Sequence, residues 1–369
     1  MDFKKYYKDL TAFIYQDLSW GPLYRKKDGE ILKDADNNAE KYILESLKIL
    51  KLKPEDLAGK KVFNIGTGRE SRYFANQNAE VTHLDITRES VKEIKEWAKK
   101  NNKKVHSTFG NILDVDIGEN KFDFIFLSGI YQHIENPAKA LVKFINALNK
   151  NGLMYMGFYR SGEFKYFIVD SIRYIITHKM MKNIRDTNAV IFNFAELNHY
   201  QSSRVMDDFY VPKKHNFHPR DIIHDIELLG AEVYSFDNDL RDYSHDGHEY
   251  FSVGGDRIYI TKKHNRVTKL EDVFDKLKTL EGKDQLFEVE YKEEIIKENI
   301  ELIKKIKLLN RTGFINDSNI IALAIGLYQF TRPFIFEESY YYKETQRHGR
   351  HLVLNKYLNN FIQLSSNFN

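Results

Sequence analysis

A short apolar strand runs into a loop with two glycines at Val62-Phe63-Asn64-Ile65-Gly66-Thr67-Gly68. Because glycine has no side chain, the backbone of such a loop can approach a ligand closely. Asp85, 19 positions after Gly66, ends the next apolar run of the sequence. Its carboxylate could accept hydrogen bonds from both hydroxyls of a ribose. Together the two features predict a ribose-containing ligand at one end of a sheet.

Around this loop, from residue 61 to residue 159, short β-branched or aromatic runs alternate with amphipathic segments. This alternation predicts parallel strands joined by crossover helices. The expected strands are Lys61–Ile65, Glu80–Leu84, Lys104–Thr108, Phe122–Leu127 and Leu153–Phe158. Two apolar helix faces are expected to cover the sheet, one formed by Val91, Ile94, Trp97 and Ala98, the other by Leu141, Ile145 and Leu148.

After Tyr159 the alternation lapses for about sixty residues, which is too long for a plain loop within a compact domain. We expect a substrate-capping helical insertion at about 160–220. The α/β pattern then returns with a helix at Pro219–Leu229 and strands at Ala231–Phe236 and Asp256–Thr261, which would complete the sheet.

The flanking regions are expected to be helical. Residues 1–60 form a helical lead-in, and residues 61–263 form the α/β domain. Residues 264–369 form a C-terminal extension, in which Ile295, Leu302, Ile306 and Leu309 fall in one helical stripe among charges. These helices could mediate a homo-oligomer.

Three further motifs follow the later strands of the expected sheet. They are Gly110-Asn111-Ile112-Leu113-Asp114, Tyr131-Gln132-His133-Ile134-Glu135-Asn136-Pro137 and Leu148-Asn149-Lys150-Asn151-Gly152-Leu153. With the glycine loop and Asp85, they make residues 61–159 resemble the class I S-adenosylmethionine-dependent methyltransferases, and the two late strands extend the resemblance loosely to residue 263. The resemblance implies an α/β, Rossmann-like, doubly wound and mostly parallel seven-stranded sheet, with S-adenosyl-L-methionine as the cofactor.

The resemblance also implies a set of cofactor contacts. Gly66 and Gly68 would lie against the methionine end, Asp85 would hold the ribose, and Asn111 with Ile112 would border the adenine. The full set of cofactor-binding candidates is Asn64, Gly66, Thr67, Gly68, Asp85, Ile86, Asn111, Ile112, Leu127 and Ser128.

Three positions depart from the family pattern. Asn64 replaces the usual acid of the first strand, Glu70 stands at the last glycine of the loop, and Asn111 replaces an aspartate. These departures predict a modest cofactor affinity and keep open a non-catalytic cofactor-binding or scaffold protein. A nicotinamide-binding Rossmann domain is the nearest structural rival. It is disfavoured because its third glycine would fall at Ser71.

Methyl transfer is an in-line displacement at a sulfonium, so positioning supplies most of the catalysis and a general base is optional. His133 follows the fourth strand and could deprotonate a hydroxyl or an amine. It could equally cap or pack in its loop.

The segment from Asp207 to His218 concentrates acids, histidines and aromatics. We expect Asp207, Asp208 and Tyr210 to contact the substrate, and His215 and His218 are further catalytic candidates. The alternative is a loop held by local hydrogen bonds. The spacing of these residues matches no defined metal site, so no metal is expected.

The charge balance bears on the acceptor. The 56 basic and 53 acidic residues leave a net charge of only +3, so no overall field draws the chain to nucleic acid. A small metabolite or natural-product intermediate, methylated on oxygen or nitrogen, is therefore the first expectation, and an RNA or protein methyltransferase is the alternative. The run Tyr340-Tyr341-Tyr342 could stack on nucleic acid, but a helix that packs its aromatic face on the core is favoured.

The chain has no cysteine, which excludes disulfides, thiolate zinc sites and a cysteine nucleophile. No apolar stretch is long enough for a membrane span, and the N-terminus lacks the pattern of a signal peptide. We therefore expect a cytoplasmic protein with no membrane partner.

Overall fold

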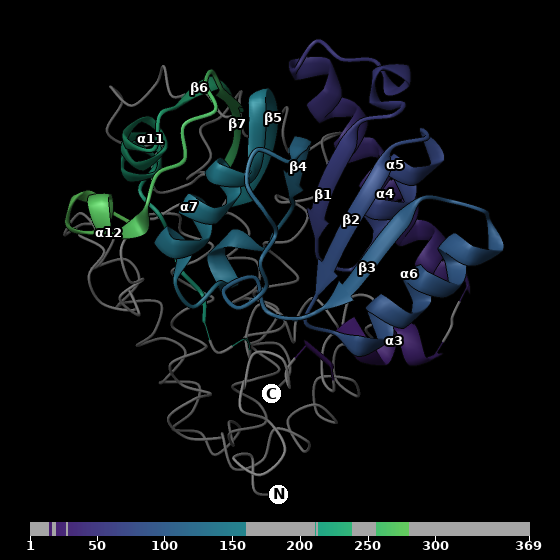
Figure 1. The fold of residues 1–369 in the computed structure, drawn as a ribbon. Coiled ribbons are helices and arrows are strands. Elements are labelled where there is room, and N and C mark those ends of the chain that lie inside the picture. The colour runs from purple at the N-terminus through teal and green to yellow at the C-terminus, as the bar shows by residue number, and fades with distance from the viewer. Residues whose placement is uncertain are drawn as a thin grey trace, which may run out of the picture.

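The computed structural model describes residues 15–16, 20–26, 29–159, 211, 213–237 and 256–279. Their centre is a seven-stranded sheet with helices packed on both faces (Figure 1). The strands are β1 Lys61–Ile65, β2 Glu80–Asp85, β3 Val105–Phe109, β4 Phe122–Leu127, β5 Leu148–Phe158, β6 Ala231–Asp237 and β7 Asp256–Lys262. The α-helices are α3 Trp20–Lys26, α4 Gly29–Ile49, α5 Arg69–Asn76, α6 Arg88–Lys100, α7 Pro137–Ala147, α11 Pro219–Leu228 and α12 Leu270–Val273. Short 3₁₀ turns lie at η2 Pro54–Leu57, η3 Tyr131–His133 and η7 Phe274–Lys276.

The strand order is β3-β2-β1-β4-β5-β7-β6. The first five strands are parallel, and β7 runs antiparallel to both of its neighbours. The predicted seven-stranded, mostly parallel sheet is thus confirmed. One expectation was wrong in detail: Leu148 belongs to β5 and pairs with Phe122, rather than continuing the helix face of Leu141 and Ile145. Its backbone is extended (φ −68°, ψ 138°), because the helix has already ended there.

Two buried clusters cover the two faces of the sheet. One joins α7 and α11 to the sheet and includes Phe63 and Phe144. The other joins α4 and α5 to the opposite face and includes Phe74 and Phe126. Figure 1 accordingly shows α7 and α11 on the other side of the strands from α4 and α5. Neighbouring residues of β1 face opposite clusters, as the two-residue period of a strand requires.

Local sequence signals explain where the helices begin. The Asn136 side chain accepts a hydrogen bond of 2.8 Å from the Lys139 backbone N–H, and Pro137 stands at the first position of α7. Both features are typical of helix N-termini.

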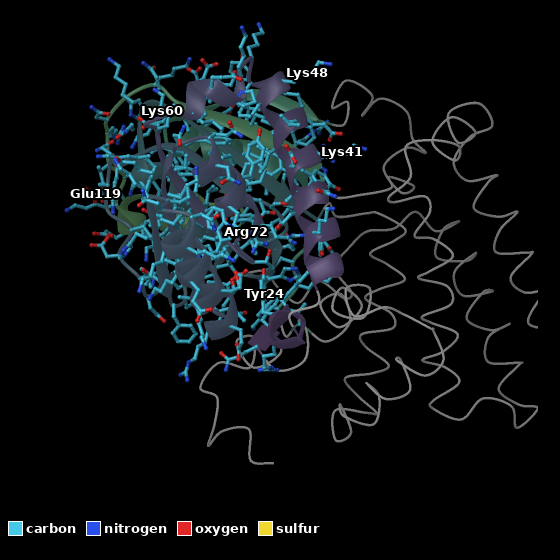
Figure 2. The ribbon with its side chains drawn as sticks, turned by 90° about the vertical axis from the view of Figure 1, so that its right-hand side faces the viewer. Tyr24, Lys41, Lys48, Lys60, Arg72 and Glu119 are labelled. Carbon is cyan, nitrogen blue, oxygen red and sulfur yellow. The ribbon has the colours of Figure 1, made fainter. Side chains whose placement is uncertain are left out.

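A buried arginine fastens the N-terminal helix to the sheet domain. The Arg72 guanidinium on α5 pairs with Asp36 of α4 at 2.5 Å and with Glu93 of α6 at 2.9 Å. Figure 2 labels Arg72 and Tyr24 within the body of the molecule, and Lys41 and Lys48 at its outer edge. Helix α4, within the predicted lead-in, therefore packs on the sheet domain.

The segment after β7 is also fastened to the sheet domain. The Asn146 side chain bonds both to the carbonyl (2.7 Å) and to the N–H (2.9 Å) of Thr268. The buried Asp225 carboxylate of α11 accepts hydrogen bonds from the backbone N–H groups of Lys278 and Thr279, both at 2.8 Å. The start of the predicted C-terminal extension, residues 264–279, thus packs on the α/β domain. The domain division itself stays a prediction, since most of the expected insertion and residues 280–369 lie outside the described residues.

None of the helices in the described part of the chain combines the length and the apolar character that a membrane span requires.

Candidate active site

The candidate site lies where the strand order reverses. After β1 the chain adds β2 and β3 on one side, then crosses to place β4 on the other side of β1. In an open α/β sheet such a reversal leaves a crevice at the carboxyl ends of the strands. Here the loop after β4 meets the glycine loop, residues 66–68, because a Cβ added to Gly66 would lie 3.2 Å from Ile130 Cδ1.

A buried histidine of β2 forms a hydrogen bond to the glycine loop. His83 on β2 lies 2.7 Å from the Gly66 carbonyl through Nε2 and 2.7 Å from the Ser107 hydroxyl through Nδ1. A carbonyl only accepts, so Nε2 carries the hydrogen. Burial lowers the pKa of His83 to about 4, which keeps the ring neutral. Sequence analysis missed this residue, since a lone histidine in a strand carries no distinguishing signal.

The two glycines of the loop have different roles. Both have positive φ, +122° at Gly66 and +81° at Gly68, which side chains rarely tolerate. A Cβ on Gly68 would stand 2.3 Å from Ile94 Cγ1. The missing side chain of Gly68 therefore makes room for α6, whereas a side chain at Gly66 would meet Ile130 of the loop after β4.

Helix α3 covers the glycine loop from the N-terminal side. The buried Tyr24 hydroxyl donates a hydrogen bond to the Thr67 carbonyl. Arg69 Nε donates to the Thr67 hydroxyl at 2.8 Å, and the Arg69 guanidinium lies 5.4 Å from the centre of the Trp20 ring. Nothing in the sequence pattern indicated this contact. It identifies Thr67 as a residue held from two sides by the protein.

Asp85 ends β2 beside this loop, with 6% of its surface exposed. Its Oδ1 accepts a hydrogen bond of 2.5 Å from the Thr87 N–H. Burial raises the pKa of Asp85 to about 7, although hydrogen bonds from Thr87 and Ser90 oppose the shift. A ligand with two adjacent hydroxyls would stabilise the charged carboxylate. Asp85 and the glycine loop beside it therefore fit the ribose and the methionine end of S-adenosylmethionine.

Asn64 is fully buried, and its side chain is bonded within the protein. Its Nδ2 donates to the Phe126 carbonyl at 3.0 Å, and its Oδ1 accepts from the Ser71 hydroxyl at 2.7 Å. The residue thereby ties β1 to β4 and to α5. Its contact with the cofactor stays a prediction, and the geometry gives it a structural task first.

The other predicted cofactor residues differ in their burial. Leu127 and Ile112 are buried in the hydrophobic core, whereas Ile86 and Ser128 are partly exposed in the loops after β2 and β4. Asn111 Oδ1 accepts a hydrogen bond of 3.0 Å from the Leu113 N–H and so shapes the turn after β3. Their cofactor contacts also stay predictions.

His133 lies in η3, directly after β4, with 6% of its surface exposed. Its Nδ1 is 3.1 Å from the Lys213 carbonyl, so Nδ1 carries the hydrogen and the neutral ring has its lone pair on Nε2. The ring packs edge-on against Tyr15, at 6.1 Å between centroids, and Tyr159, at 5.5 Å. A histidine in this tautomer can accept a proton at Nε2.

The remaining predicted histidines have structural partners. The buried His215 donates from Nε2 to the Ile134 carbonyl at 3.0 Å. His218 is exposed, and its Nδ1 accepts from the Arg220 N–H at 3.3 Å, at the start of α11. His218 therefore caps a helix, and the catalytic roles of both residues stay predictions. Asp207, Asp208 and Tyr210 lie outside the described residues.

Three buried polar residues beside His133 were not singled out from the sequence. They are Gln132, Lys214 and Asn216, with 0%, 4% and 4% of their surfaces exposed. Lys214 Nζ lies 3.3 Å from Asn216 Oδ1 and 5.4 Å from the Tyr159 ring centre. A lysine or glutamine in a loop is ordinarily exposed, so only the fold could reveal their burial.

Comparison with known families gives one match to part of the chain. Residues 63–156 match a family described as "Methyltransferase domain". No curated protein gives a significant match.

Solved structures with a similar arrangement include PKMT2 from Rickettsia typhi (15% identity, TM-score 0.43, covering 57% of this chain and 49% of that one). The chain thus spans about half the length of that protein. Two others contain bound S-adenosylhomocysteine. They are 1,6-didemethyltoxoflavin-N1-methyltransferase from Burkholderia thailandensis (13% identity, TM-score 0.38, 66% and 86% covered) and magnesium protoporphyrin IX methyltransferase from Synechocystis (12%, 0.37, 62% and 83%).

Proposed function

We propose that this chain, of which residues 63–156 match a methyltransferase-domain family, uses S-adenosylmethionine to methylate an oxygen or nitrogen of a small metabolite or natural-product intermediate. The observation that carries the proposal is Asp85 beside the glycine loop, together with the buried polar residues around η3, a short turn that follows Ile130, the residue next to Gly66. The first pair fits the cofactor, and the second supplies groups for an acceptor.

Enclosure favours a small acceptor. The polar residues next to η3 are almost fully buried, with at most 6% of any surface exposed; they are Gln132, His133, Lys214, His215 and Asn216. A site that encloses them suits a molecule that enters whole better than one strand of a macromolecule.

The bound cofactor supplies a methyl group on a positively charged sulfur. Asp85 would hold the ribose, and the backbone at Gly66 would lie against the methionine end. His133 Nε2 would take the proton that the acceptor hydroxyl or amine loses on methylation. S-adenosylhomocysteine would be the second product.

Transfer of a labelled methyl group tests the proposal. The purified protein is incubated with methyl-labelled S-adenosylmethionine and a cell extract separated into small molecules, RNA and protein. We expect label in the small-molecule fraction, and none when the Asp85→Ala variant is used. Label confined to RNA or protein would replace the small acceptor by the macromolecular alternative. Binding of S-adenosylhomocysteine without transfer to any fraction would support a non-catalytic role.

A further inference from the structure

Among the described residues, Gln132 is the buried side chain with the most polar atoms that lack a hydrogen-bond partner. It has no exposed surface, and neither its Oε1 nor its Nε2 has a hydrogen-bond partner among the described residues. A buried amide without partners costs about 1–3 kcal/mol. Buried polar groups in native proteins are nearly always bonded. An amide with both ends open therefore calls for a ligand.

The backbone of Gln132 fixes where this amide lies. Its carbonyl accepts a hydrogen bond of 2.8 Å from the His215 N–H, and the next residue, His133, bonds to the Lys213 carbonyl. Residues 132 and 133 are thus held by the segment 213–216, which follows β5 in the chain. A Cβ added to Gly129 would lie 3.8 Å from Gln132 Nε2.

The position separates Gln132 from the ribose side of the crevice. Asp85 ends β2, on one side of β1, whereas Gln132 follows β4 and is tied to the segment beyond β5. Ile130, two residues before Gln132, lies beside Gly66 of the glycine loop. The amide therefore lies on the acceptor side, next to His133.

We infer that Gln132 selects the acceptor through paired hydrogen bonds to a group that presents an N–H and a C=O side by side, as a primary carboxamide or a lactam does. The inference rests on the proposed function, because it assigns the acceptor side of that same site. The amide of glutamine offers one acceptor oxygen and a donor nitrogen next to each other. A carboxamide or lactam matches both at once and leaves no buried polar atom open.

Gln132→Met tests this role, because methionine keeps the length and the approximate volume of glutamine and removes the amide. Gln77→Met, at the end of α5, is the control for the substitution itself. Two probe pairs differ only in the N–H group: benzamide against acetophenone, and δ-valerolactam against cyclohexanone. Dissociation constants are measured by NMR titration, with and without S-adenosylhomocysteine.

We expect the wild type and the control to bind the amide probes about tenfold more tightly than the ketones, since a site built for a polar group rejects the analogue that lacks it. In Gln132→Met this preference should disappear. The melting temperature of the ligand-free variant should equal or exceed that of the wild type, because an unsatisfied amide has been removed.

Equal binding of amide and ketone by the wild type, a preference that survives in Gln132→Met, or a lower melting temperature for that variant would each overturn the inference. The titrations without S-adenosylhomocysteine keep this outcome separate from the proposed function. If S-adenosylhomocysteine fails to bind the wild type while the probe preference depends on Gln132, the methyl-transfer proposal fails and the amide site stands.

Discussion

The Tyr24 hydroxyl donates a hydrogen bond to the Thr67 backbone carbonyl and so joins α3 to the glycine loop across 43 positions of the chain. Tyr24 is almost fully buried, and burial raises the pKa of its hydroxyl well above the usual range. The phenol therefore stays protonated and remains a donor at every physiological pH. Helix α3 thereby supports the glycine loop of the candidate site.

Tyr24→Phe removes this hydrogen bond and leaves the Thr67 carbonyl unpaired. We expect the free energy of unfolding to fall by about 1–3 kcal/mol and the affinity for S-adenosylhomocysteine to fall as well, because the loop loses its cover. Urea denaturation and calorimetric titration measure the two effects. Tyr234→Phe, at an exposed position of β6, is the control. An unchanged affinity would mean that α3 does not support the cofactor site.

Asp85→Asn should weaken S-adenosylhomocysteine binding and remove its dependence on pH. The pKa of Asp85 is raised to about 7, so this residue is protonated in acid when the protein is free. The charged carboxylate, however, is the form that best accepts hydrogen bonds from both ribose hydroxyls. The wild-type affinity should therefore fall as the pH is lowered from 8 to 5, with proton release on binding below pH 7. Loss of the charge should cost about 1–3 kcal/mol at pH 8. Calorimetry in buffers of different ionisation enthalpy measures both, and a flat wild-type profile would contradict the ribose assignment.

His83 should make the fold sensitive to acid. Its pKa is lowered to about 4 in the folded chain from about 6.5 in the unfolded chain, so between these values the unfolded state binds the extra proton. Stability from neutral His83 is thus complete above about pH 6.5 and is lost as the pH falls toward 4. The difference in unfolding free energy between the wild type and His83→Gln should shrink by about 3 kcal/mol over this window. A difference that is independent of pH, as expected for the exposed control His106→Gln, would refute the effect.

Gly68→Ala should destabilise the fold mainly through Ile94. Gly59→Ala is a matched control, because Gly59 has a similar φ of +72° with nothing within 4 Å of an added Cβ. The control should cost about 1–2 kcal/mol for its left-handed backbone, and Gly68→Ala about 1–3 kcal/mol more for overpacking. In an Ile94→Ala background this excess should vanish. A double-mutant cycle by urea denaturation measures it, and an excess that persists would exclude the clash as its cause.

His133→Gln should slow methylation without affecting cofactor binding. A positioned general base contributes about 10²–10⁴-fold to the rate, and His133 bonds to Lys213 rather than to the glycine loop. We expect a fall in kcat of this order at pH 7, with the affinity for S-adenosylhomocysteine unchanged. The exposed His106→Gln again serves as the control. Wild-type turnover in His133→Gln would return the residue to a packing role.

The sequence predicts the sheet best where strands are continuously apolar. Lys61–Ile65 and Phe122–Leu127 were predicted to the residue, because strands buried on both faces leave little choice of period. The early start of β5 was missed. The run Asn149-Lys150-Asn151-Gly152 is typical of a turn, and Asn151 indeed has a φ of +63°, yet Leu148 pairs before it.

Long-range polar contacts could not be predicted, since no local pattern records them. Lys262 is fully buried, and its Nζ lies 3.0 Å from Asn120 Oδ1 and 3.1 Å from the Leu148 carbonyl. A lysine at the end of a strand is ordinarily a solvated charge. For the same reason, the burial of Lys214 and Gln132 was not predicted. The positions of Gly66 and Asp85 were predictable because each lies at the carboxyl end of a parallel strand, β1 and β2 respectively.

The hydrogen bonds from residues 278 and 279 to Asp225 also decide where the chain can be cut. A shortened protein that ended at residue 263, after the last strand, would lose the donors that surround a carboxylate with no exposed surface. It would also uncover the apolar residues that Val273 and Leu277 contact in the core. His224 Nδ1, 2.9 Å from Asp225 Oδ1, would remain, but the loss of the other donors would leave a buried carboxyl group poorly satisfied, which is destabilising. Expression of the catalytic domain alone therefore requires an end beyond Thr279.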